Sequence, residues 1–167
     1  IQAKDLATLS TAENLILVDV SNGKNAFEND QRQHLDKALF VDLNTDLADI
    51  KDDFAKGGRH PLPTIEKFSG TLSRLGITKE SHVVVYDDKN GSNAAARFWW
   101  MLKAVGHEKV QVLDGGYQEA VKNGFPVNSK EVVPSPSKPY AIKGWQLPVA
   151  AMDEVEKAVH NQNHIVV

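Results

Sequence analysis

Short apolar runs alternate along this chain with segments whose apolar residues recur at helical spacing. The runs at 15–20, 38–43, 82–86 and 109–113 have the composition of β-strands. Three of these runs are continuously apolar, as strands are when helices cover both faces of their sheet. Strands that alternate with helices predict an α/β fold with a mainly parallel sheet and helices on both faces.

Three helices are predicted between and after these strands. In the segment 64–76 the apolar residues fall on one helical stripe, with Thr64 at the position of an N-cap and Gly76 just beyond the end. The segment 93–106 is apolar nearly all round, which predicts a buried helix, and the segment 117–124 predicts a shorter one. The start of the chain also has a helical pattern that leads into the first strand.

The pattern changes at residue 128, which indicates a division of the chain into domains. Residues 128–145 hold three closely spaced prolines and little periodicity, as an extended and stiff linker does. Residues 146–167 have a helical pattern followed by the beginning of an apolar strand, the same order with which the chain starts. We therefore expect one domain at 1–127, a linker, and the truncated start of a second, similar domain at 146–167.

Composition and charge remove several classes of function. The 167 residues are 41% hydrophobic and 25% charged, which is typical of a globular protein. The net charge of −3 is spread without a basic stripe, so a nucleic-acid partner is not expected, and no apolar run has the length of a membrane span. We expect a cytoplasmic protein, with a removed signal peptide left open because the sequence begins with Ile1.

The absence of cysteine limits the chemistry of the segment itself. Without thiols there is no disulfide, no thiolate metal site and no nucleophilic cysteine. The histidines lack the spacing of metal ligands, and the acidic run 46–54 does not match a calcium loop. No metal and no cofactor is therefore expected.

The segment 87–93 has the setting of an anion-binding loop. It joins the third predicted strand to the long apolar helix, and the N–H groups at the start of a helix attract negative charge. It should lie at the carboxyl ends of the strands, where ligands bind in sheets of this kind. However, the loop begins with two carboxylates, Asp87 and Asp88, and its strongest nucleophile is Ser92.

The order and spacing of several motifs across residues 1–127 resemble the rhodanese (thiosulfate sulfurtransferase) family, in particular the N-terminal half of its two-domain members. The matching stretches are "LILVDV", "QHLDKALFVDLN", "HPLP", "SRLGI", "HVVVYD", "AARFWWMLKAVGH" and "VQVLDGGYQEAVKNGFPV". The chain departs from the family at Asp36 and Lys37, where Pro and Gly are usual, and at Ala120, where an aromatic residue is usual. These positions lie outside the reactive loop, so they affect local packing more than the assignment.

The resemblance accounts for the loop that begins at Asp87. In catalytic rhodanese domains a cysteine occupies this position, and loop N–H groups at a helix start hold its thiolate. A carboxylate can bind to the same N–H groups, but it cannot carry a sulfane sulfur as a persulfide. The resemblance therefore implies that this segment has no catalytic residue. It implies as partner the C-terminal catalytic rhodanese domain of the same protein, and as substrates small anionic sulfur donors, thiosulfate or 3-mercaptopyruvate.

The resemblance also implies three candidates for residues that face the substrate cleft. Asn44 and His60 match segments that face the active loop of the partner domain, and mercaptopyruvate-using members have an acidic residue at the place of Asn44. Arg59 can attract an anionic donor, since arginine pairs well with oxyanions. The competing interpretation makes His60 a cap of the turn before Pro61, and Asn44 and Arg59 ordinary loop residues.

Two further interpretations stay open beside a sulfurtransferase half. One is a stand-alone, non-catalytic rhodanese-like binding module. The other is a phosphate-handling α/β domain, because Asp87 and Asp88 lie beside a helix start, although no GxxxxGK[ST] or GxGxxG motif is present. Arg97, in the buried aromatic helix, is expected to form an internal ion pair with Asp87 or Asp114.

Overall fold

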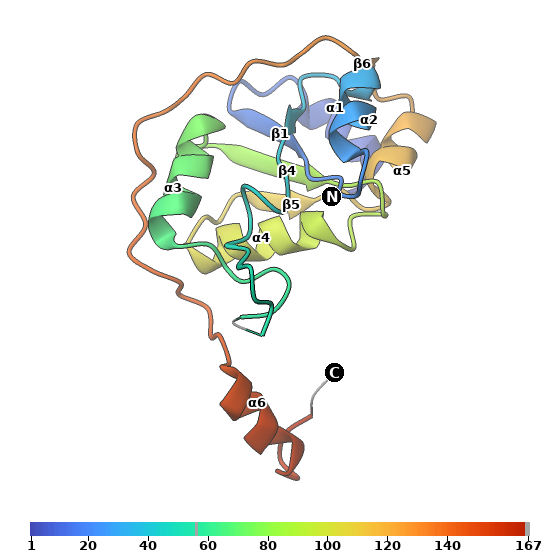
Figure 1. The fold of residues 1–167 in the computed structure, drawn as a ribbon. Coiled ribbons are helices and arrows are strands. Elements are labelled where there is room, and N and C mark those ends of the chain that lie inside the picture. Colours follow the sequence, from blue (N-terminus) through green and yellow to red (C-terminus); the bar gives the residue numbers. More distant parts are fainter. Residues whose placement is uncertain (56, 166–167) are drawn as a thin grey trace.

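The computed structural model describes residues 1–55 and 57–165, and a four-stranded parallel sheet forms its centre (Figure 1). In spatial order the strands are β3 (Leu39–Phe40), β1 (Leu15–Asp19), β4 (His82–Tyr86) and β5 (Val110–Val112). Leu15 pairs with His82 and Asp19 pairs with Tyr86, so β1 and β4 end at the same edge of the sheet. The loop that follows β4 therefore begins at the carboxyl edge, as predicted.

Helices cover both faces of the sheet. The helices α3 (Ile65–Arg74) and α4 (Ala94–Ala104) share a hydrophobic core with one face, and α1 (Ala3–Leu9) and α5 (Gly116–Lys122) share a second core with the other. The helix α2 (Ala26–Arg32) precedes a small antiparallel pair, in which β2 (His34–Leu35) lies beside β6 (Val127–Asn128). The predicted α/β fold with a mainly parallel sheet is confirmed.

The strand β4 explains why the strand candidates are continuously apolar. Its residues Val83 and Val85 belong to the core beneath α3 and α4, whereas Val84 and Tyr86 belong to the core beneath α1 and α5. All four residues are 0% exposed. A strand that is buried on both faces has no solvent-facing positions at which polar residues could alternate.

The predicted limits of α3 are confirmed by its capping geometry. The Thr64 hydroxyl accepts a hydrogen bond from the Lys67 N–H at 3.2 Å, which satisfies one of the free donors at the helix start. Gly76 follows the helix with a φ of 73°, a left-handed conformation that favours glycine.

The strand predicted at 38–43 is shorter in the structure, where β3 holds only Leu39 and Phe40. The chain turns away after Val41 because the Asp42 carboxylate accepts the N–H groups of Asn44 and Thr45, both at 2.8 Å. An aspartate that binds the backbone two and three residues ahead favours a turn over an extended strand.

The elements α2, β2 and β6 were not predicted. Of the seven residues of α2 only Ala26 is buried, and Phe27 is 52% exposed, so the helix has almost no apolar stripe. The strands β2 and β6 contain two residues each, which is too few for an alternating pattern.

Residues 129–147, which we call the strap, are extended but docked on the domain rather than free (Figure 1). The Ser137 N–H donates to the Ser73 carbonyl at 2.8 Å, and the Tyr140 carbonyl accepts from the Ser69 hydroxyl at 2.7 Å. Tyr140 is 4% exposed, and the Trp145 ring stacks on Phe68 at 5.6 Å between centroids. Most of the predicted linker thus packs along α3.

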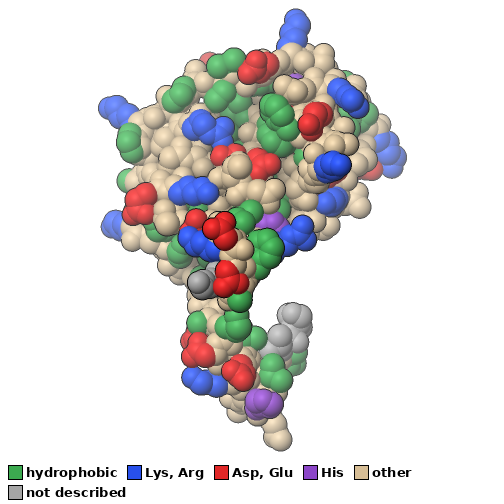
Figure 2. Space-filling view, viewed as in Figure 1, with side chains coloured by type: hydrophobic (Ala, Val, Ile, Leu, Met, Phe, Trp, Pro, Cys, Tyr) green, Lys and Arg blue, Asp and Glu red, His purple; other side chains and the backbone are tan. Residues whose placement is uncertain are grey.

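The helix α6 (Met152–Val159) projects from the body of the domain (Figure 1). None of its residues is buried, and Figure 2 shows hydrophobic side chains exposed along it. Its apolar residues Met152, Val155 and Val159 are 75%, 38% and 64% exposed. The apolar strand expected after it contains Ile165, which is not part of a strand, and the last two residues lie outside the described part. Among residues 1–55 and 57–165, no helix is long and apolar enough to cross a membrane.

Candidate functional site

Asp87 fills the anion-binding loop with its own carboxylate. Its Oδ1 accepts the N–H groups of Lys89 and Gly91, both at 2.8 Å, and its Oδ2 accepts those of Asn93 and Ala95, both at 3.1 Å. We call these four N–H groups the cradle. Asp87 is 0% exposed, and its two carboxylate oxygens are the acceptors that the start of α4 needs.

The turn before α5 closes the cradle from the other side. The Tyr117 N–H donates to the Asp87 carbonyl at 3.0 Å, which brings the start of α5 against the loop. Gly116 makes this approach possible, because a Cβ at that position would collide with the Asp87 carbonyl oxygen. The Gly-Gly pair of the "LDGG" motif therefore shapes the loop although it is distant in sequence.

Two of the three cleft candidates contact each other. The Nε2 of His60 lies 3.1 Å from the amide oxygen Oδ1 of Asn44, 16 positions away within the same connection between β3 and α3. The Asn44 backbone is fixed in turn, because its N–H donates to the Asp42 carboxylate at 2.8 Å. The side chains of Asn44 and His60 thus form a hydrogen-bonded polar pair near the surface.

This contact determines which ring nitrogen of His60 is free. An amide oxygen only accepts hydrogen bonds, so Nε2 carries the proton and donates it to Asn44. In the neutral ring Nδ1 then keeps its lone pair and can accept a hydrogen bond from a ligand. Burial, followed by the positive charges of Arg59 and Arg97, lowers the pKa of His60, so the neutral ring is favoured.

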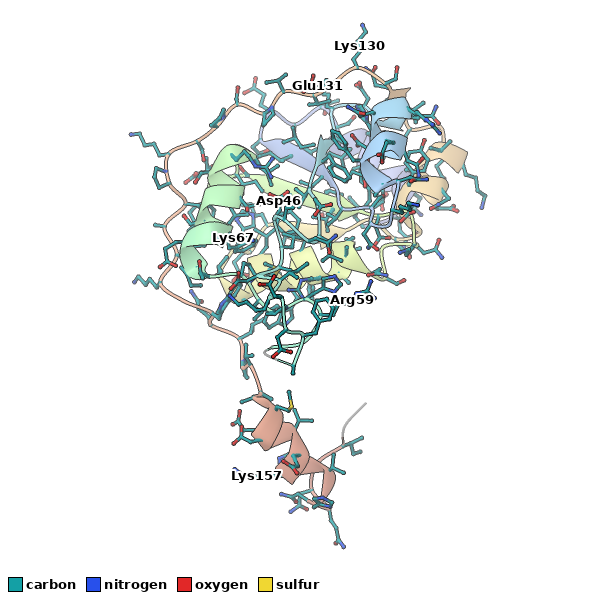
Figure 3. All side chains as sticks on the ribbon, in the orientation of Figure 1. Asp46, Arg59, Lys67, Lys130, Glu131 and Lys157 are labelled. Carbon is teal, nitrogen blue, oxygen red and sulfur yellow. The ribbon has the colours of Figure 1, made fainter. Side chains whose placement is uncertain are left out.

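Arg59, the third candidate, is exposed beside His60. It belongs to the connection before α3, and Figure 3 shows it on the side of the domain toward which α6 lies. It adds positive charge near the Asn44–His60 pair, since its charge is one of the causes that lower the His60 pKa. Elsewhere on this face Figure 2 shows acidic and basic side chains intermingled without a large patch of one sign.

The expected ion pair of Arg97 with Asp87 or Asp114 is wrong. The guanidinium instead donates to backbone carbonyls, with Nη2 at 2.9 Å from Leu47 O, 3.0 Å from His60 O and 3.2 Å from Pro61 O. The Asp87 carboxylate already accepts the four N–H groups of the cradle. Asp114 accepts a hydrogen bond from Gln2 at 2.7 Å.

The acidic run 46–54 forms no metal centre in the part of the chain that the structure describes, where no cluster of three ligating side chains is found. Asp46 pairs with Arg74 at 2.7 Å, and Asp49 pairs with Lys51 at 2.5 Å (Asp46 is labelled in Figure 3). Both ion pairs are partly exposed to solvent, and the first ties the run to α3.

The sequence did not predict that two acids, Asp19 at the end of β1 and Asp30 in α2, lie close together. Asp19 is 3% exposed, and burial raises its pKa, while burial and the charge of Asp19 raise the pKa of Asp30 to about 6. Both line a cavity of about 270 Å³ that Asp88 also borders. The available signal was an aspartate at the carboxyl end of an otherwise apolar strand, the position at which Asp87 was noticed on β4.

The sequence matches the family model described as "Rhodanese-like domain" over residues 2–123. Over 106 residues the chain is 43% identical to thiosulfate/3-mercaptopyruvate sulfurtransferase 1, mitochondrial, of Arabidopsis thaliana, which covers 64% of this chain and 26% of that protein. Over 117 residues it is 33% identical to human 3-mercaptopyruvate sulfurtransferase, which covers 70% of this chain and 38% of that protein. The chain thus spans well under half of the length of these relatives.

The fold leads to the same family. The solved structure of 3-mercaptopyruvate sulfurtransferase from Leishmania major superposes with a TM-score of 0.75 at 25% identity, over 87% of this chain and 41% of that one. Because the family model spans most of the residues and the α/β fold agrees with that of a solved relative, this chain belongs to the rhodanese-like domain family.

Proposed function

We propose that this chain is the N-terminal, non-catalytic half of a sulfurtransferase that moves sulfane sulfur from thiosulfate or 3-mercaptopyruvate to a thiophilic acceptor such as cyanide or a thiol. The names of the relatives in Arabidopsis and human support the reaction class. The observation that supports a non-catalytic role for this half is the cradle, whose four N–H groups all bind the Asp87 carboxylate.

The chemistry of sulfur transfer explains why a filled cradle matters. A catalytic thiolate attacks the sulfane sulfur and forms a persulfide, while the donor leaves as sulfite from thiosulfate or as pyruvate from 3-mercaptopyruvate. Asp87 holds its negative charge where such a thiolate would be stabilised, but its oxygens form no bond to sulfur that could be passed on. The chain has no cysteine that could take over this step.

The rest of the active site then belongs to a second domain. We infer that this domain carries the nucleophilic cysteine and that the Asn44–His60 pair, with Arg59 beside it, lines its substrate cleft. A hydrogen-bond acceptor at His60 Nδ1 and a positive charge nearby suit a small oxyanion that carries a proton or is bound through water. The exposed apolar residues of α6 are consistent with a helix that packs into such a domain.

Asn44 bears on the choice of donor. Its amide accepts and donates hydrogen bonds but does not take up a proton at neutral pH, so it does not provide a general base. We therefore favour thiosulfate over 3-mercaptopyruvate as the donor, because thiosulfate transfer needs no proton removal at the place of Asn44. The proposed compartment is the cytoplasm, with the mitochondrion as the alternative because one relative in Arabidopsis is named mitochondrial.

Persulfide trapping in the natural full-length protein tests the proposal. The protein is incubated with thiosulfate or 3-mercaptopyruvate, alkylated and analysed by peptide mass spectrometry. We expect the added sulfur on a cysteine outside residues 1–167 and thiocyanate release when cyanide follows. A full-length protein that takes up no sulfur from either donor would instead favour a stand-alone, non-catalytic binding module.

The phosphate-handling alternative has no support in the geometry of the loop. A phosphate at the start of α4 would need the free N–H groups of the cradle, and Asp87 already occupies all four. A binding module remains the second candidate, because the same filled cradle also suits a domain that has no reaction to perform.

A further inference from the structure

The side chain of Arg97 joins the start of α4 to two parts of the connection between β3 and α3. It extends from α4 and donates from Nε and Nη2 to Leu47 O at 3.2 and 2.9 Å. The same Nη2 lies 3.0 Å from His60 O and 3.2 Å from Pro61 O. One guanidinium thus holds the loop that follows Asn44 and the carbonyl group of His60 itself.

Arg97 is held by backbone carbonyls alone within residues 1–55 and 57–165, where no carboxylate forms an ion pair with it. It is half-buried, and burial lowers its pKa. A partly buried charge with four hydrogen bonds to carbonyl groups is strongly bound to one geometry, because moving any of these groups leaves the charge less well solvated.

A backbone hydrogen bond shares the acceptor of Arg97. The Asp49 N–H donates to Pro61 O at 3.1 Å, so the two parts of the β3–α3 connection are joined directly at the carbonyl that Arg97 also binds. From α3 the Lys67 ammonium donates to Ala48 O at 2.6 Å, between the residues that Arg97 and Pro61 bind. The Asn44–His60 pair therefore belongs to a connection whose backbone is bound by side chains from both α3 and α4.

The position of Arg97 along α4 relates the pair to the cradle. The Ala95 N–H binds the Asp87 carboxylate, and Arg97 follows two residues later, in the same first turns of the helix. The start of α4 thus binds the Asp87 carboxylate with its backbone and the β3–α3 connection with its arginine. Any displacement of this helix end would move both.

We propose that Arg97 is a positioning residue that sets the placement of His60 and Asn44 by binding the backbone on either side of the pair. This proposal rests on the proposed function only for the claim that the Asn44–His60 pair lines a substrate cleft. The positioning of the pair by Arg97 is a property of this chain alone. It is measurable without any sulfur transfer, so its failure and the failure of the proposed function are distinguishable.

The test compares Arg97→Lys and Arg97→Met with the unchanged 167-residue chain by NMR. The first readout is hydrogen exchange at the Asp49 amide, which we expect to become about tenfold faster or more in both variants while the amides of β4 stay protected. The second is the titration of His60. Its pKa should rise toward the ordinary value in both variants, because the ring loses burial when the loops loosen.

Arg97→Lys separates positioning from charge. Lysine keeps the positive charge but lacks the planar fork that reaches several carbonyls at once. If Arg97 acted on His60 through its charge alone, the lysine variant would leave both readouts unchanged and only the methionine variant would raise the pKa of His60. That result would overturn the proposal.

Lys103→Met is the matched control, because it removes a positive charge from the same helix. Lys103 lies in the last turn of α4 and pairs with Glu108 at 3.2 Å, so it shares no partner with Arg97. Burial first, and the charges of Lys79 and Lys103 among lesser causes, lower the pKa of His107. The control should therefore raise the pKa of His107 and leave His60 and the Asp49 amide unchanged. If both Arg97 variants fail to fold, Arg97 is a general stabilising residue and the proposal is likewise overturned.

Discussion

At the scale of single residues, the Asp87 carboxylate satisfies four N–H groups, of which those of Gly91 and Ala95 are buried, and replacing it tests how far the loop depends on these bonds. Asp87→Ala removes every acceptor of the cradle and should lower the free energy of unfolding by about 2–4 kcal/mol, since buried donors without partners are costly. Urea denaturation measures this change. The matched control is Asp88→Ala at the exposed neighbouring position, which should change stability by about 0.5 kcal/mol or less. Equal stability of the two variants would contradict the description of the cradle.

Asp30 gives the domain a predicted dependence on pH. Its pKa is raised from the ordinary value of 3.8 to about 6 in the folded state, because burial and then the charge of Asp19 disfavour the ionised form. The folded chain therefore holds the proton more tightly than the unfolded chain, and this contribution to stability is lost as the pH rises from about 4 to about 6. Asp30→Asn should lose less stability than the unchanged chain over that window. Parallel stability curves from urea unfolding would show that Asp30 does not titrate in this way.

The contacts of single side chains were the least predictable part of the site. Asn44 and His60 were selected individually, but nothing in the sequence shows that their side chains meet across the 16 positions that separate them. Arg97 was expected to pair with an acid because a buried charge usually does. Its actual partners are carbonyl groups, which every residue carries, so no residue type marks them in the sequence.

At the scale of elements, the docking of the strap depends on a buried hydrogen bond. The Tyr140 hydroxyl lies 2.8 Å from Nδ1 of His107, and both residues are buried. Tyr140→Phe keeps the ring and removes this bond, so it should lower the free energy of unfolding by about 1–2 kcal/mol. Tyr117→Phe is the control, because the Tyr117 hydroxyl binds Gln33 at the same 2.8 Å in an exposed position. Its removal should change the free energy of unfolding by about 0.5 kcal/mol or less. Equal effects would mean that the strap is not held at this point.

Elements with many buried residues were predicted well, and those with few were not. The strand β4 and the helices α3 and α4 carry long apolar patterns because each packs against the centre of the fold. In contrast, α2 buries one residue, and β3 is cut short by the Asp42 turn. Burial produces the pattern that sequence analysis detects, so marginal elements at the periphery leave little trace.

At the scale of the whole molecule, the proposed cleft predicts a kinetic role for His60. In the full-length enzyme, His60→Ala should lower kcat/KM about tenfold, which corresponds to about 1.4 kcal/mol of transition-state binding. Folding should be nearly unchanged, because His60 is half-buried and its backbone stays bound to Arg97. Kinetics with thiosulfate and with 3-mercaptopyruvate measure the effect. Unchanged values with both donors would make His60 a turn residue only.

The central claim is that residues 1–167 hold an electropositive cradle without a sulfur carrier. The most direct measurement is the formation of thiocyanate by the purified 167-residue chain, incubated with cyanide and either thiosulfate or 3-mercaptopyruvate. Because Asp87 occupies the cradle and no cysteine is present, we predict no thiocyanate above the rate of the reagents alone. Sustained turnover by this chain with either donor would contradict the claim and require a nucleophile that the cradle does not hold.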